Sequence, residues 1–352
     1  MPPHPHPLTH RLVPSPAGRI HLVEQGSGPL VLLLHGFPEF WYSWRHQLPA
    51  LAAAGYRAVA IDVRGYGRSS RPEATSAYRM LDLVEDNVAV VHALGECSAV
   101  LVGHDWGATI AATSALVRPD VFRAVALLSV PYTPPGGPRP SEVFVHIGGE
   151  DEEFYVSYFQ EPGRAEAEIE SDVRGWLAGF YAALSADTMP EPGAPDPHFV
   201  TRGGMGGGTG GGTLRERFPR DRRPSWLTDH ELDVYAGEFE RTGMTGALAR
   251  YRNMDRDWED LTNGGHTGAP VTQPSLFIGG SLDASTTWLA DAIKAYPVTL
   301  PALTGSRILE GCGHWLQQER PAETNALLTD WLDSLPSLPS MPAATTTTDG
   351  GH

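Results

Sequence analysis

Short apolar runs alternate with longer amphipathic segments over the first 130 residues. Glycine-bounded runs, which are typical of buried strands, occur in "RIHLVEQG", "GPLVLLLHG" and "RAVAIDVRG". The segment "WYSWRHQLPALAAAG" lies between the last two, has apolar residues at helical spacing and ends at Gly55. "DLVEDNVAVVHALG" and "SAVLVGHD" repeat the helix and strand order. Strands that alternate with helices predict an α/β fold with a mostly parallel, doubly wound sheet.

This pattern stops at Pro131, where "PYTPPGGPRPSE" has the composition of a linker. In "RAEAEIESDVRGWLAGFYAALS", helical spacing predicts that one face meets a core: Ala165, Ile169, Val173, Trp176, Phe180 and Leu184. "RGGMGGGTGGGT" predicts a mobile surface loop, and it lacks the lysine of a phosphate-binding loop. "TDHELDVYAGEFERTG" predicts a helix that begins at the capping box Thr228/Glu231 and ends at Gly243.

The strand pattern resumes near residue 274 with "PSLFIGGSLD" and continues through "SRILEGCGHW" to the amphipathic "AETNALLTDWLDSL". The chain is therefore divided into a first core part (1–132), an inserted helical lid (133–269) and a second core part (270–335). Residues 1–18, rich in proline and histidine, are expected to be loose. Residues 336–352, rich in proline, threonine and glycine, predict a disordered tail.

Charge and cysteine content narrow the set of partners. The 352 residues carry a formal charge of −16, which disfavours nucleic acid and anionic membranes and favours an uncharged or cationic small molecule. The only cysteines, Cys97 and Cys312, indicate neither a disulfide framework nor a cysteine-rich metal site. No apolar run has the length of a signal peptide or a membrane span. We expect a cytoplasmic protein without metal or organic cofactor; its oligomeric state stays open, a homodimer included.

The stretch "LVGHDWGATIAA" has the shape of G-x-S-x-G, the strand–turn–helix elbow that exposes a nucleophile, but Asp105 occupies the tip. The tight turn requires Gly103 and Gly107. The alternative is an aspartate that merely caps the following helix. Two later strand ends carry Asp283, in "FIGGSLDAS", and His314, in "LEGCGHWLQ", which is the chain order of nucleophile, acid and histidine. For each residue taken alone there is an alternative: Asp283 as a turn residue and His314 as a surface histidine.

The strand end "LLLHGFPEFWYSW" places His35-Gly36 and the amide of Phe37 near the elbow. The amides of Phe37 and Trp106 are the expected oxyanion-hole donors. His104 and Asp62 are interpreted as structural residues. Because an aspartate is ionised at neutral pH, Asp105 suits attack on an sp³ carbon and formation of a covalent ester. His314 would then activate the water that hydrolyses this ester, oriented by Asp283. Esterase and protease activities are not expected.

Two electrophiles suit such a nucleophile: a carbon–halogen bond, whose halide needs N–H donors, and an epoxide, whose alkoxide needs a proton donor. Tyrosines supply such a proton, and Tyr155 in "EEFYVSYFQEPGRAEAE" and Tyr251 in "ALARYRNMDRDW" are the candidates. Core packing is the alternative for both. The indole N–H of Trp106 keeps halide release open, so a haloalkane or haloacid dehalogenase and a non-catalytic small-molecule-binding protein remain alternatives.

"HGFPEFWYSWR", "GHDWGA", "YFQEPGRAEAE", "YRNM" and "CGHW" resemble the soluble α/β-hydrolase-fold epoxide hydrolases, which are unrelated to the microsomal type, over about residues 19–333. The elbow motif is shared with dehalogenases, whereas the two lid motifs are more specific. The resemblance implies the triad Asp105, Asp283 and His314, with Tyr155 and Tyr251 activating the oxygen of a small apolar epoxide to give a vicinal diol. The residues expected to contact that substrate are His35, Phe37, Pro38, Trp106, Phe159 and Trp315.

Overall fold

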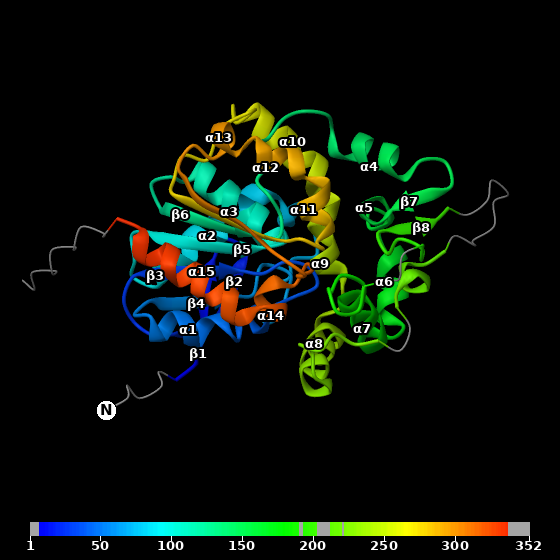
Figure 1. Ribbon diagram of the computed structural model, residues 1–352, viewed down its shortest axis with the longest axis horizontal. Helices are drawn as coiled ribbons and strands as arrows, with labels where there is room; N and C mark the ends of the chain where they lie inside the picture. Colours follow the sequence, from blue (N-terminus) through cyan, green and yellow to red (C-terminus); the bar gives the residue numbers. More distant parts are fainter. Residues whose placement is uncertain (1–6, 190–192, 203–211, 220–221, 337–352) are drawn as a thin grey trace, which may run out of the picture.

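The computed structural model describes residues 7–189, 193–202, 212–219 and 222–336 (Figure 1). Its main sheet has eight strands in the order β1-β2-β4-β3-β5-β6-β9-β10. Their bounds are β1 (Thr9–Ser15), β2 (Gly18–Gln25), β3 (Leu30–Leu34), β4 (Arg57–Ile61), β5 (Ala99–His104), β6 (Phe122–Leu128), β9 (Ser275–Gly280) and β10 (Leu303–Leu309). Neighbours from β4 to β10 are parallel, whereas β1 and β2 form an antiparallel edge. The predicted α/β fold with a mostly parallel sheet is confirmed.

Both faces of the sheet are covered by apolar side chains. Leu32 and Leu101 belong to one buried cluster, which includes residues of α2 (Met80–Ala93) and α3 (Trp106–Val117). Their neighbours Val31 and Val100 belong to the other cluster, with residues of α1 (Gln47–Ala53) and α15 (Pro321–Ser334). Because these strands are buried on both faces, they are continuous apolar runs in the sequence rather than alternating ones.

The remaining helices follow the order of the chain. They are η1 (Trp41–Trp44), η2 (Thr75–Tyr78), α4 (Pro140–Gly148), α5 (Tyr155–Tyr158), α6 (Arg164–Glu170), α7 (Val173–Ala183), η3 (Leu214–Arg217), α8 (Asp229–Thr242), α9 (Thr245–Ala249), η4 (Tyr251–Asn253), α10 (Met254–Asn263), α11 (Ala284–Trp288), α12 (Ala290–Lys294), α13 (Tyr296–Thr299) and α14 (Leu316–Glu319). None of the helices in the described ranges has the length and apolar character required to cross a membrane. Figure 1 shows α4 to α8 beside the main sheet. Their assignment to a lid over residues 133–269 stays a prediction.

The helix pattern predicted for the lid agrees with the structure in part. α8 begins after the predicted capping box, in which the Thr228 hydroxyl accepts a hydrogen bond from the backbone of Glu231, and it ends at Gly243. The predicted helical segment over residues 164–185 forms two helices, α6 and α7. Asp172 interrupts it by accepting a hydrogen bond from the backbone N–H of Gly175, which starts α7. Of the six predicted core positions, five are buried and Leu184 packs at the edge of the same core.

Two strand regions were not expected. Residues 9–15, predicted to be loose, form β1 and pair along their length with β2. In the lid, β7 (Glu152–Phe154) and β8 (Phe199–Thr201) form a separate two-stranded sheet. Residues 203–211 of the predicted glycine-rich loop and 337–352 of the predicted tail lie outside the described residues, so both interpretations stay predictions.

Candidate active site

Asp105 stands on a strained turn between β5 and α3. Its backbone has φ 53° and ψ −122°, in the left-handed region that a non-glycine residue seldom adopts. A Cβ atom on Gly103 would lie 2.1 Å from the carbonyl oxygen of Gly107, and one on Gly107 would lie 2.0 Å from the carbonyl oxygen of Leu34. Only glycine therefore fits on either side of the tip. The Asp105 side chain makes no capping hydrogen bond to α3, so the interpretation of this residue as a helix cap is wrong.

The Asp105 carboxylate is held by two groups from other strand ends. Its Oδ1 atom accepts a hydrogen bond from the backbone N–H of Phe37 at 2.8 Å, and its Oδ2 atom lies 3.6 Å from Nε2 of His314. Burial alone would raise the pKa of Asp105, but the interactions with His314 and the Phe37 N–H bring that pKa below its ordinary value. The side chain is therefore an anion at neutral pH.

His314 lies between two carboxylates. Its Nδ1 atom is 3.0 Å from Oδ1 of Asp283, which follows β9. Burial disfavours a charged imidazole, yet the charges of Asp283 and Asp105 raise the pKa of His314 well above its ordinary value. The backbone N–H of His314 donates to the carbonyl of Leu184 in the lid at 2.9 Å. The two carboxylates thus favour the protonated imidazole in the free protein, and both core and lid fix its position.

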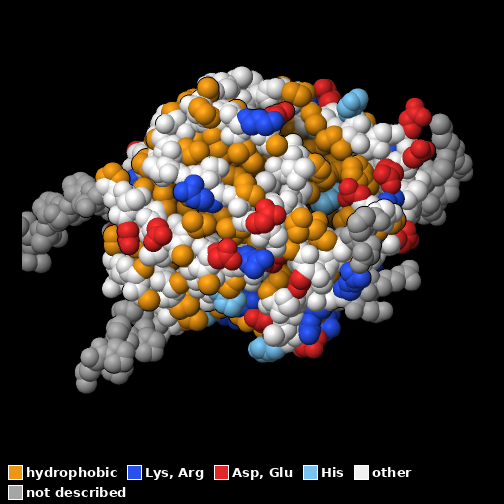
Figure 2. Space-filling view, in the orientation of Figure 1, with side chains coloured by type: hydrophobic (Ala, Val, Ile, Leu, Met, Phe, Trp, Pro, Cys, Tyr) orange, Lys and Arg blue, Asp and Glu red, His pale blue; other side chains and the backbone are white. Residues whose placement is uncertain are grey.

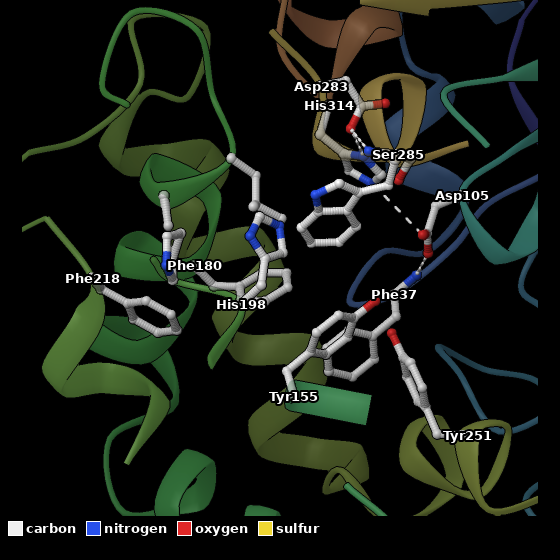
Figure 3. A pocket seen from close by; sticks show the side chains of 14 residues that line it. Phe37, Asp105, Tyr155, Phe180, His198, Phe218, Tyr251, Asp283, Ser285 and His314 are labelled. Atoms are coloured by element: carbon white, nitrogen blue, oxygen red, sulfur yellow. Dashed lines mark hydrogen bonds and ion pairs between the residues drawn. The ribbon is translucent and has the colours of Figure 1, made fainter. Parts of the chain in front are cut away.

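Tyr155 begins α5 and Tyr251 begins η4, and their ring centroids are 6.1 Å apart. Figure 3 shows both hydroxyls on the side of the pocket that holds Asp105. Burial raises the pKa of each tyrosine, and the negative charge of Asp105 raises it further. Both hydroxyls therefore keep their protons across the neutral range and are available as donors.

Contacts between the two lid motifs fix the positions of these tyrosines. The side-chain amide of Gln160 donates to the backbone oxygen of Tyr251 at 3.0 Å. Arg252 donates to the Glu166 carboxylate at 2.7 and 2.8 Å and to the backbone oxygen of Phe159 at 3.0 Å. Since such paired, buried hydrogen bonds are directional, the segments that carry the two tyrosines are held together.

The site opens into two cavities. A small one of about 40 Å³ is lined by Asp105, both tyrosines, Asp283 and His314, together with lid residues such as Phe180 and Phe218 (Figure 3). A larger one of about 890 Å³ is mostly apolar and is lined by residues of α3, α4, β8 and α11, Trp106 among them. The two share Asp105, Tyr155, Tyr251, Ser285 and Trp288. The proposed nucleophile thus lies where a substrate with one short and one long arm would be bound.

Comparison with known proteins places this geometry in a family. Residues 29–190 match the family described as alpha/beta hydrolase fold. The chain is 43% identical to epoxide hydrolase B of Mycobacterium tuberculosis, across 93% of this chain and 98% of that protein. The chain belongs to the α/β-hydrolase-fold epoxide hydrolases. A solved epoxide hydrolase from an endophytic Streptomyces is 68% identical with a TM-score of 0.88, over 93% of this chain and 95% of that one. Epoxide hydrolase A of Mycobacterium thermoresistibile is 42% identical with a TM-score of 0.84, over 94% and 99% of the two chains.

Two predicted substrate contacts of this epoxide hydrolase are buried behind the pocket wall. His35 is 1% exposed; its Nδ1 donates to its neighbour's backbone oxygen at 2.8 Å and its Nε2 accepts from the N–H of Val63 at 3.0 Å. The carbonyl of Pro38 accepts from the hydroxyl of Tyr181 at 2.6 Å. Among the described residues, neither lines the two cavities, and substrate contact stays a prediction for both.

Two further predicted substrate contacts, the aromatic residues Phe159 and Trp315, are also buried. Phe159 is fully buried and packs against Tyr251, with ring centroids 5.0 Å apart. Trp315 is fully buried, donates from Nε1 to the Tyr181 carbonyl at 3.1 Å and packs its ring 4.7 Å from that of His314. Neither lines the two cavities in the described part of the chain. Each ring packs against a candidate site residue, Tyr251 or His314, and substrate contact stays a prediction for both.

Sequence reasoning missed Ser129 and Glu39, which together with His104 support the backbone of His314. The hydroxyl of Ser129, after β6, donates to the backbone oxygen of His314 at 2.6 Å, and Nε2 of His104 lies 2.8 Å from the same oxygen. Nδ1 of His104 is 2.8 Å from a buried carboxylate oxygen of Glu39. Asp62 accepts from the backbone N–H of Trp41 at 2.9 Å, in agreement with its structural interpretation. Ser129 has a positive φ of 67° at a strand end, and no pattern in the sequence predicts that conformation.

Proposed function

We propose that this epoxide hydrolase converts an epoxide to a vicinal diol through a covalent ester on Asp105. One observation carries the proposal: an ionised carboxylate on a strained elbow shares a cavity with an imidazole and two protonated tyrosines. Because Tyr155 and Tyr251 belong to residues 133–269, the inserted lid is part of the proposal. No metal or organic cofactor is invoked, since each chemical role has a side chain or backbone group.

In the first step, a carboxylate oxygen of Asp105 attacks one epoxide carbon. A carbon–oxygen ester bond forms while the carbon–oxygen bond of the strained ring breaks. The released alkoxide takes a proton from Tyr155 or Tyr251, whose hydroxyls lie on the same side of the cavity (Figure 3). The tyrosinate that is left regains a proton from the His314 imidazolium through water, so the second step starts with a neutral His314 and two protonated tyrosines. A haloalkane would need N–H donors for its halide instead, and the relatedness to epoxide hydrolases favours the epoxide.

In the second step, water attacks the carbonyl carbon of the ester. His314 must be neutral to take the proton of this water, although Asp105 and Asp283 favour its charged form in the free enzyme. Ester formation removes the negative charge of Asp105, so the first step itself lowers the pKa of His314. The backbone N–H of Phe37, already 2.8 Å from an Asp105 oxygen, and that of Trp106 are the proposed donors to the tetrahedral oxyanion.

Isotope labelling tests the covalent route. In a single turnover with enzyme in excess in ¹⁸O-water, the first diol should be unlabelled and Asp105 should gain one ¹⁸O atom, detected by peptide mass spectrometry. Label in that first diol would mean direct attack by water. His314→Gln should accumulate the ester, whereas His230→Gln, a change at an exposed histidine of α8, should turn over like the parent. Halide release from haloalkanes without diol formation from epoxides would favour a dehalogenase, and turnover of neither would favour a binding protein.

A further inference from the structure

Two polar side chains in the small cavity have no role in the proposed mechanism. Beside Asp105, Asp283, His314 and the two tyrosines, its lining includes His198 and Ser285. Figure 3 shows His198 on the lid side of this cavity, across from His314. His198 comes from the segment just before β8 and lies far along the chain from every motif that predicted the site. The His198 side chain is 16% exposed and lines the cavity, so a bound molecule can contact it.

The His198 ring is fixed in position. Its Nδ1 atom lies 2.7 Å from Oδ1 of Asp196, and its backbone N–H donates to the same oxygen at 2.9 Å. Its backbone oxygen accepts from the N–H of Tyr155 at 2.8 Å, which ties it to a proposed proton donor. The ring packs against Trp288 with a centroid distance of 4.6 Å.

The bond to Asp196 also determines which nitrogen carries the proton. Burial would raise the pKa of Asp196, but the hydrogen bond and charge of His198 lower it, so Asp196 is an ionised acceptor. Nδ1 of His198 is then the donor, and in the neutral ring Nε2 carries the lone pair. A bound molecule therefore meets a hydrogen-bond acceptor at His198.

The volumes of the two cavities restrict the arm that reaches this acceptor. A space of about 40 Å³ corresponds to roughly three water-sized positions, at about 10–15 Å³ for each. That is enough for a hydroxymethyl group and too little for an aryl ring. The larger cavity, about 890 Å³, accepts a long apolar arm. Figure 2 shows hydrophobic side chains gathered in the region of α4 and α11, where Ile147 and Trp288, which line this larger cavity, are exposed.

We propose that the small cavity is a subsite for a hydroxymethyl arm, with Nε2 of His198 accepting a hydrogen bond from the substrate hydroxyl. The enzyme would thus prefer 2,3-epoxy alcohols that carry an apolar chain on the far epoxide carbon. This inference rests on the proposed function and names its substrate class. A carboxylate arm fits less well, because Asp105, Asp283 and Asp196 are acidic and the whole chain has a net charge of −16.

Matched substrates test the subsite across a range of pH, because Nε2 of His198 accepts a hydrogen bond only in the neutral ring. They are a trans 2,3-epoxy alcohol with a pentyl chain, its methyl ether, and the isostere in which a methyl group replaces the hydroxyl. The ratio of kcat/KM for alcohol to isostere is compared between enzymes, so that intrinsic reactivity cancels. We expect His198→Phe to lower this ratio about tenfold, the effect of losing one substrate hydrogen bond. His198→Gln, which keeps an acceptor, should restore part of it, and His230→Phe should leave it unchanged.

An unchanged ratio in His198→Phe would overturn the subsite, as would a ratio that depends on Ser285→Ala instead. If His198→Phe fails to fold, the parent enzyme decides alone: a higher kcat/KM for the alcohol than for the isostere of equal size, in which a methyl group replaces the hydroxyl, supports the polar subsite, and equal values overturn it. Failure of the proposed function gives a different result: the isostere would not be hydrolysed, or Asp105 would gain no ¹⁸O. If only the subsite proposal fails, the isostere is still hydrolysed and Asp105 is still labelled.

Discussion

Neutralising Asp105 should lower the pKa of His314, which is the change that the second chemical step requires. The two carboxylates lie 3.6 Å (Asp105) and 3.0 Å (Asp283) from the imidazole nitrogens. At an effective dielectric constant of about 20, Coulomb's law gives about 5 kcal/mol of attraction for each pair. Asp105→Asn keeps the shape of the side chain and removes one of these attractions, as the ester does. About half of the stabilisation of the imidazolium is then lost.

The assay is a pH titration of the His314 ring by ¹H–¹⁵N NMR in the parent and in Asp105→Asn. The titration of His314 should move to lower pH in the variant, while exposed His230 should titrate identically in both. The pH dependence of unfolding gives a second readout. Because the folded-state pKa of His314 is raised, its contribution to stability is complete below the unfolded pKa and is lost as pH rises through the folded pKa. The decrease in the free energy of unfolding at alkaline pH should therefore be smaller in Asp105→Asn. An unchanged His314 titration would refute the charge-switching argument.

Three further predictions concern the donors, the elbow and a buried ion pair. Tyr155→Phe and Tyr251→Phe should each slow alkylation measured by stopped-flow fluorescence, and the double variant should nearly abolish it; full activity of the double variant contradicts the proton-donor role. Gly107→Ala should destabilise the fold by more than about 2 kcal/mol in urea unfolding, because its Cβ would lie 2.0 Å from a backbone oxygen, and an unchanged midpoint contradicts the clash. Arg250→Met should cost about 3–5 kcal/mol by leaving the Asp257 carboxylate buried without its partner, and adding Asp257→Leu should recover part of that loss.

The central strands of the sheet, such as β3 and β5, were predictable because burial on both faces makes them apolar runs, and such runs depend only on local composition. β1 was not, because it is an edge strand in which Pro14 is tolerated and most side chains are exposed. The break between α6 and α7 was present in the sequence as Ser171-Asp172, but the apolar spacing continues through it. β7 and β8 are only three residues each and pair across about 45 residues of sequence, so no local pattern indicates them.

The convergence of Asp105, Asp283 and His314 was predictable because the carboxyl ends of parallel strands meet at one edge of a sheet. Residues that line or support the pocket from elsewhere were not. His198 reaches the cavity through the β7–β8 pairing, and Ser129 reaches the backbone of His314 through a left-handed turn. Four residues were predicted to contact substrate because they lie next to motif residues in the sequence: His35, Pro38, Phe159 and Trp315. Among the described residues they do not line either cavity, and their contact with substrate stays a prediction.

The position of His314 makes the relation between core and lid part of the proposed chemistry. Its side chain is set by Asp283 of the core, but its backbone N–H is held by Leu184 of the lid, at 2.9 Å. The lid also supplies both tyrosines through contacts that join Gln160 to the backbone of Tyr251. A displacement of the lid would therefore move the proton donors and the base together relative to Asp105. Attack, protonation and ester hydrolysis thus all require one arrangement of lid and core, which explains why lid residues far apart in sequence are joined by buried hydrogen bonds.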